Sequence, residues 1–123
     1  MLLTGDIEQL AEQALLERDP AALRADVLLV PHHGSGTSSS PGFLAAVGPG
    51  LAVIPVGYRN RFSHPVAAVL ERYAAIRTRV LRTDLDGAVT VRLGAAGAQA
   101  SGERAQRPRY WRPAGDRLAP AGG

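Results

Sequence analysis

Every histidine of this 123-residue chain lies in a short polar segment that follows an apolar run. His32 and His33 occur in VPHHGSGTSSSP (30–41), His64 occurs in YRNRFSHP (58–65), and Asp6 follows LLTG (2–5). Imidazole and carboxylate groups are suitable ligands for Zn, Mn or Fe, and a carboxylate can bridge two ions. Two bridged ions about 4 Å apart can activate water and stabilise the leaving oxygen of a phosphodiester. These residues are therefore candidates for a divalent-metal site.

Each of these residues also has an ordinary structural interpretation. Asp6 is a natural N-cap for the helix expected next to it, and for this residue alone we favour that role. His32 and His33 can bond the backbone carbonyls of a loop, and His64 can cap a helix that begins at Pro65. The metal site is favoured only by the residues together, because three predicted strands deliver them to one sheet edge, where α/β proteins bind ligands.

The segment after His33 is rich in small residues and permits two further hypotheses. Gly34, Gly36 and the serines leave backbone N–H groups free to hold a phosphate near the helix expected at Pro41. Ser35 is a possible nucleophile, but it lacks the G-x-S-x-G pattern of a hydrolase elbow, so this hypothesis is the weaker one.

The elements that must position these residues alternate along the chain. Strands are predicted over 2–5, 27–30, 51–56, 79–84 and 88–93, the last two joined at the turn dipeptide Asp86-Gly87. Helices are predicted over 7–17, 41–47 and 65–76, the second one starting at Ser40 and Pro41. In the first helix Ile7, Leu10 and Leu15 form the apolar stripe, and Glu12 lies elsewhere on the cylinder. The alternation of helices with buried strands predicts an α/β layered domain.

The composition restricts the class of protein. A hydrophobic fraction of 46% suits one small globular domain, and a net charge of +3 excludes a polycation. All fourteen basic residues are arginine, and the absence of cysteine excludes disulfides and thiolate metal sites. No apolar run reaches the roughly 18 residues of a membrane span, and the N-terminus has no signal-peptide pattern. The chain by itself is predicted to be soluble.

The C-terminal part of the sequence differs from the rest. Residues 94–123 are rich in Ala, Gly, Pro and Arg without a period, which predicts a disordered tail. Within it, segment 104–113 places four arginines around Tyr110 and Trp111. Such a segment can bind nucleic acid through phosphate contacts and stacking, although a solvated tail is the preferred interpretation.

Four stretches in series carry a family resemblance: LLTGD, ADVLLVPHHGSGTSSSPGFL, LAVIPVGYRNRFSHP and RVLRTDLDGAVTVRL. Over residues 2–93 they resemble the C-terminal half of the metallo-β-lactamase-fold domain of ComEC-type DNA-internalisation proteins. The resemblance implies that residues 1–93 are part of an αββα sandwich that holds two metal ions, Zn or Mn, when complete. It also implies a nuclease that degrades one strand of incoming DNA while the other strand crosses the membrane.

The resemblance also implies roles for single residues. Asp6 matches the metal-bridging aspartate, and His64 matches the last histidine ligand. One residue of the His32–His33 pair contacts metal or the scissile phosphate, with His33 preferred as the ligand and both histidines assigned to catalysis. Ser35, Arg59, Asn60 and Arg61 are expected to contact the substrate.

The sequence departs from the family in one large respect. The H-x-H-x-D-H type metal motif of the N-terminal half is absent from these residues, as is the membrane channel. We therefore expect a truncated piece of a longer protein that associates with the membrane through its parent and has DNA and the channel as partners. Alone it should bind metal weakly, self-associate and show little nuclease activity. The alternatives are a non-enzymatic remnant or accessory nucleic-acid-binding module and, less favoured, a hydrolase of small esters or amides.

Overall fold

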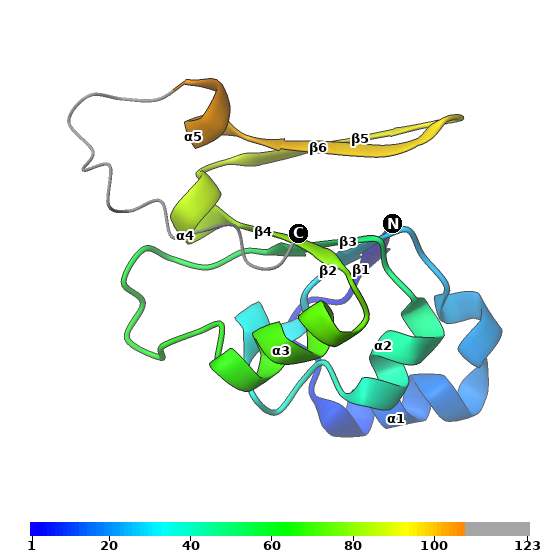
Figure 1. Cartoon of the computed structure of the whole chain (residues 1–123). Coiled ribbons are helices and arrows are strands. Elements are labelled where there is room, and N and C mark those ends of the chain that lie inside the picture. Colours follow the sequence, from blue (N-terminus) through cyan, green and yellow to red (C-terminus); the bar gives the residue numbers. More distant parts are fainter. Residues whose placement is uncertain (108–123) are drawn as a thin grey trace.

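The computed structural model describes residues 1–107 of the chain. Its elements, in chain order, are β1 (Leu2–Leu3), α1 (Gln9–Arg18), η1 (Pro20–Leu23), β2 (Val27–Leu29), η2 (Pro31–Gly34), α2 (Pro41–Val47), β3 (Leu51–Ile54), α3 (Ala67–Ala75), β4 (Arg79–Arg82), α4 (Thr83–Asp86), β5 (Val89–Gly94), β6 (Gly97–Gly102) and α5 (Glu103–Gln106). Figure 1 shows three layers: helices α1, α2 and α3, then the sheet β1–β4, then the ribbon β5–β6. No helix within residues 1–107 is long and apolar enough to cross a membrane.

The central sheet is parallel, with the strand order β1-β2-β3-β4. Leu2 pairs with Leu28, Leu28 with Ala52, and Ala52 with Val80. The predicted α/β class is confirmed, because the first four predicted strands form this sheet and helices join them. All carboxyl ends of the strands therefore meet at one edge.

Both faces of the sheet are covered, which explains why β2 and β3 are apolar without alternation. On one face Phe43, Leu44, Val69 and Tyr73 of α2 and α3 pack against residues such as Leu28. On the other face the ribbon β5–β6 covers a smaller cluster, formed by Val27, Leu51, Val53 and Leu81 with Val89, Val91, Ala98 and Ala100 packed against it. The second layer is thus a small antiparallel sheet.

Helix α2 begins and ends as its sequence predicts. The Ser40 hydroxyl accepts a hydrogen bond from Phe43 N, and Pro41 occupies the first turn. The helix ends at Gly48, which has φ +56° and donates its N–H to Leu44 O. Gly tolerates this left-handed conformation without steric cost.

Helix α1 differs from its prediction. Glu8 rather than Asp6 is the N-cap residue, Leu10 is 87% exposed, and Glu12 is fully buried. The Glu12 carboxylate accepts hydrogen bonds from Ser39 N (2.7 Å) and Ser40 N (2.8 Å). Those two donors lie at the start of α2, so this tertiary contact buries Glu12, while Ile7 and Leu15 of the expected stripe still pack against the core.

The C-terminal part of the described chain also differs from its prediction. Asp86-Gly87 does not join two paired strands; helix α4 follows β4, and β5 pairs with β6 from Val89–Gly102 to Gly94–Gly97. Residues 97–106 were assigned to the disordered tail but form β6 and α5. The reason is pairing with β5 and hydrogen bonds from the Arg104 guanidinium to Asp84 O and Leu85 O. The remaining tail, with Tyr110 and Trp111, lies outside the described residues.

Candidate functional site

Three consecutive βα loops bring Asp6 and the three histidines together at the carboxyl edge of the sheet. Asp6 follows β1, His32 and His33 form η2 after β2, and His64 lies in the loop after β3. His33 Nε2 lies 3.4 Å from Asp6 Oδ1. The ring centroid of His32 lies 6.4 Å from that of His33 and 6.0 Å from that of His64. These four residues are called the histidine cluster below.

Backbone hydrogen bonds hold the three loops against one another. His32 N donates to Gly5 O at 3.0 Å, which joins the second loop to the first. Val66 N donates to Gly34 O at 3.1 Å, which joins the third loop to the second. The relative positions of the cluster residues are therefore set by main-chain contacts and not only by their side chains.

The two adjacent histidines both have a left-handed backbone. The φ angle is 49° at His32 and 55° at His33, a left-handed conformation that only a few per cent of non-glycine residues adopt, although His, Asn and Asp adopt it more often than others. Each such residue costs about 1–3 kcal/mol, and strain of this kind is concentrated at functional sites. The fold sustains this cost in the segment that carries both imidazoles.

The His33 ring has a defined hydrogen-bonding arrangement. Its Nδ1 lies 2.6 Å from Pro55 O, and because a carbonyl oxygen only accepts, Nδ1 carries the proton. Nε2 then faces the carboxylate of Asp6, and both side chains are open to solvent. Metal-binding histidines commonly donate one N–H to a backbone carbonyl and bind through the other nitrogen. The His33–Asp6 pair therefore has the donor chemistry of a metal site.

His32 lies beside a carboxylate that sequence reasoning did not select. Its Nδ1 is 3.1 Å from Glu8 Oε1, yet this buried nitrogen makes no hydrogen bond of acceptable geometry. We regard the pair as a close contact without a hydrogen bond, because a short distance alone does not make one. No local pattern selected Glu8, because the sequence predicts that it belongs to the first helix, whereas it is the N-cap residue of α1.

The donors present suit a transition-metal ion, but their number is small. Within residues 1–107, no group of three or more His, Cys, Asp or Glu residues is arranged so that it could hold a metal ion. The orphaned Nδ1 of His32 and the facing acceptors of His33 and Asp6 are the observations that fit a cation.

Asn60 holds His64 in place through the backbone. The Asn60 amide nitrogen donates to His64 O at 2.6 Å, and its Oδ1 accepts from His64 N at 2.9 Å. The Phe62 ring stacks on the His64 ring with centroids 5.8 Å apart. Asn60, expected to contact substrate, thus makes positioning contacts, and its substrate contact remains a prediction.

The other expected substrate residues lie in different surroundings. Arg59 and Arg61 are exposed on the loop before His64, whereas Ser35 is nearly buried and its hydroxyl contacts Thr37 Oγ1 at 3.0 Å. The serine-nucleophile hypothesis needs a base at that hydroxyl, and the residue beside it is Thr37. The phosphate hypothesis loses its two serine donors next to Pro41, because Glu12 already accepts from Ser39 N and Ser40 N.

Comparison with known proteins adds relatives but no structural match, since no family model and no solved structure matches the chain. The chain is 42% identical over 111 residues to competence protein ComA of Neisseria gonorrhoeae, covering 90% of this chain and 16% of that protein. It is 41% identical over 91 residues to ComE operon protein 3 of Bacillus subtilis, and this match covers 74% of this chain and 12% of that protein. It is 38% identical over 91 residues to recombination protein 2 of Haemophilus influenzae, and this match covers 74% of this chain and 11% of that protein. The chain thus spans a small part of each relative, and the similarity points to a competence-related family.

Proposed function

We propose that the histidine cluster is part of a divalent-metal-dependent phosphodiesterase site that acts on DNA during uptake. One observation carries the proposal: Nε2 of His33 and Oδ1 of Asp6 face each other 3.4 Å apart, while Nδ1 of His33 is held by Pro55 O. A lone pair facing a carboxylate is repulsive unless a cation or a proton lies between them. The competence-related names of the relatives support a role in DNA uptake.

In this proposal Asp6 and His33 hold the first ion, Zn or Mn, and His64 contributes to the same centre. Such an ion, when bound, lowers the pKa of its water and stabilises the leaving oxygen of a phosphodiester. Asn60 keeps the His64 backbone in place, and the Glu8 carboxylate lies 3.1 Å from Nδ1 of His32, the second catalytic candidate.

We also propose a larger context for the site. The parallel sheet with helices on one face and a small sheet on the other supports its assignment to the C-terminal half of a metallo-β-lactamase-like sandwich. Two ions with about four ligands each need more donors than this cluster contains. The complete centre therefore takes ligands from a longer protein whose other part is a membrane channel, and the isolated chain is weakly active.

Calorimetric titration of the chain with Mn²⁺ and with Zn²⁺ tests the metal site. Asp6→Asn and His33→Ala should each weaken metal binding about 10-fold or more. Asp26→Asn is the matched control, because Asp26 is exposed and precedes β2 at the opposite end of the sheet. Equal affinity in all four proteins would overturn the assignment of these ligands.

A non-catalytic DNA-binding module is the second candidate function, and the exposed Arg59 and Arg61 on the loop before His64 favour it. The two functions differ in their response to metal. The nuclease should release labelled nucleotides from DNA only with Mn²⁺ or Zn²⁺, whereas a binding module retains DNA in EDTA and cleaves none under either condition.

A further inference from the structure

The loop between β3 and α3 carries two aromatic side chains on the protein surface. Tyr58 is 53% exposed and Phe62 is 62% exposed, whereas Phe43 and Tyr73 are buried in the core. Leaving two rings in water forgoes the burial energy that a core position would supply. Residues 58–62 are called the arginine–aromatic loop below.

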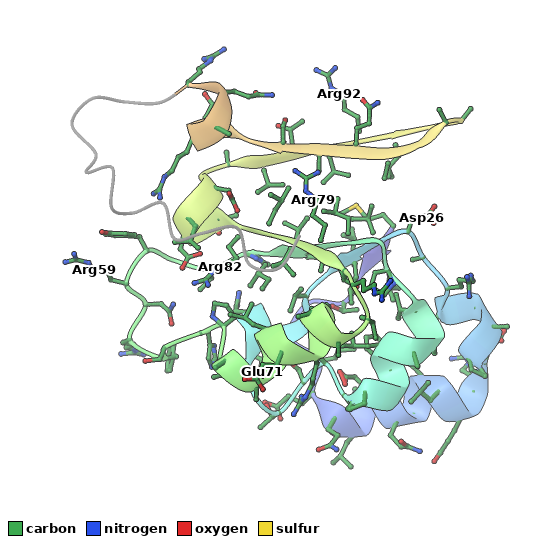
Figure 2. The ribbon with its side chains drawn as sticks, in the orientation of Figure 1. Asp26, Arg59, Glu71, Arg79, Arg82 and Arg92 are labelled. Atoms are coloured by element: carbon green, nitrogen blue, oxygen red, sulfur yellow. The ribbon has the colours of Figure 1, made fainter. Side chains whose placement is uncertain are left out.

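Each exposed ring has a guanidinium over its face. Arg59 lies 5.2 Å from the Tyr58 centroid, and Arg61 lies 4.7 Å from the Phe62 centroid. Arg104 of α5 approaches the Tyr58 ring as well, at 6.0 Å. Figure 2 shows Arg59 pointing from the loop away from the sheet and helices.

The local charge is entirely positive along this part of the chain. No acidic residue occurs between Asp26 and Glu71. Of the acidic side chains on α4 and α5, Asp84 is paired with Arg82 and Glu103 with Arg107, and Asp86 accepts a hydrogen bond from Arg82 N. The surface beside the rings therefore suits a polyanion.

The loop is joined directly to the histidine cluster. Phe62 stacks on His64 at an interplanar angle of 28°, and the His64 ring is 6.0 Å from that of His32. A polymer bound on the loop would therefore lie next to the histidine cluster, because Phe62 contacts His64 directly.

We propose that the arginine–aromatic loop binds single-stranded nucleic acid, with unpaired bases stacked on Tyr58 and Phe62. The guanidiniums of Arg59 and Arg61 contact the phosphates, while that of Arg104 stays hydrogen-bonded to Asp84 O and Leu85 O and adds positive charge beside Tyr58. An exposed cation–π contact is worth only about 0.5–1 kcal/mol, so a guanidinium readily leaves its ring to a base and turns to a phosphate. A duplex keeps its bases stacked on one another, and the loop therefore selects single strands.

This proposal deepens the proposed function by naming the form of the substrate, and it needs no metal. Arginine beside exposed aromatic side chains also suits an anionic membrane surface. We propose nucleic acid as the partner because the Phe62 ring stacks on His64 of the histidine cluster. The test below distinguishes this partner from a membrane.

The test measures fluorescence anisotropy of a labelled oligo(dT) and of a labelled DNA hairpin with the full chain in EDTA. Tyr58→Ala and Phe62→Ala should each weaken oligo(dT) binding about 5-fold or more. Tyr58→Phe and Phe62→Tyr keep the rings and should bind as the wild type does. Leu10→Ala changes an exposed apolar side chain on α1 and is the matched control for surface hydrophobicity.

Three results would overturn the proposal: equal affinity for the hairpin, unchanged affinity in both alanine variants, or alanine effects seen only with vesicles of phosphatidylglycerol. Circular dichroism confirms that each variant is folded. Because binding is measured in EDTA, failure here leaves the metal titration unaffected. Conversely, if binding depends on the two rings but the chain has no metal affinity, the proposal for the loop stands and the proposed nuclease function is rejected.

Discussion

Gly34 and Pro65 touch so closely that no side chain fits between them. A Cβ built on Gly34 would lie 2.5 Å from Pro65 Cβ and 2.9 Å from its Cα. Gly34 also has φ +82°, a conformation that disfavours every L side chain. This contact sets the distance between the segment that carries His32 and His33 and the segment that carries His64.

Substituting Gly34 should therefore destabilise the fold and separate two parts of the cluster. Gly34→Ala should lower the free energy of unfolding by about 2 kcal/mol or more, from overpacking and backbone strain together. Gly36→Ala is the matched control, because its nearest contact is Val66 Cγ2 at 3.7 Å. Urea denaturation measures both variants, and equal midpoints would contradict the contact.

Asn60 should stabilise the backbone at His64 and contribute little to the stability of the whole fold. Asn60→Ala removes both hydrogen bonds to the His64 backbone, so the His64 amide should exchange with deuterium faster. Asn60→Asp keeps an acceptor for His64 N and should give an intermediate rate. Hydrogen exchange followed by mass spectrometry is the measurement, and identical protection in all three proteins would reject the positioning role.

Glu12 should be required for stability although it is charged. Glu12→Gln leaves one of the two donors, Ser39 N or Ser40 N, facing an amide NH₂, which should cost about 1–3 kcal/mol. Glu17→Gln on the exposed side of α1 should change stability by less than about 0.5 kcal/mol. Thermal unfolding distinguishes these variants, and a neutral Glu12→Gln would show that the buried carboxylate is dispensable.

Tyr73 predicts how stability depends on pH in alkaline solution. Burial raises the pKa of the Tyr73 hydroxyl far above its ordinary value; the hydrogen bond with Ser39 lowers it, and the charge of Glu12 raises it, by smaller amounts. Above pH 10 or so the unfolded state loses this proton first, so stability should fall by up to about 1.4 kcal/mol per pH unit. The chain contains no lysine and no cysteine, which removes two of the side-chain types that ordinarily titrate in this range.

Tyr73→Phe should remove most of that alkaline slope, even though it also loses the contact with Ser39 Oγ at 2.9 Å. Tyr58→Phe on the exposed loop should keep the wild-type slope. Unfolding by urea at a series of pH values between about 9 and 12 gives the slopes, and parallel curves for wild type and Tyr73→Phe would contradict the assignment.

The sequence predicted the parts of the fold that depend on local signals. Val27–Leu29 and Leu51–Ile54 are continuous apolar runs, and Ser40 with Pro41 is a local cap, so each was recognisable without its partners. The convergence of Asp6 and the histidines followed from a general rule about the carboxyl ends of parallel strands.

The remaining features depend on contacts between distant residues. Glu12 is buried because two N–H groups 27 and 28 residues away need an acceptor, which no helical pattern reveals. Strand β6 has the sequence GAQASG, with no β-branched or aromatic residue, and it is a strand because β5 pairs with it. The hydrogen bonds between Asn60 and the His64 backbone could not be predicted either, because the sequence suggested a ligand-binding role for both residues.

The strand order β1-β2-β3-β4 has a consequence for biosynthesis. Each strand pairs with the one made immediately before it, so the sheet can grow by addition as the polypeptide leaves the ribosome. The cluster gathers in the same sequence: Asp6 first, then the histidine pair, and finally His64 once Val66 reaches Gly34. A ribosome paused before that point would carry a nascent chain with a growing sheet and an unfinished site.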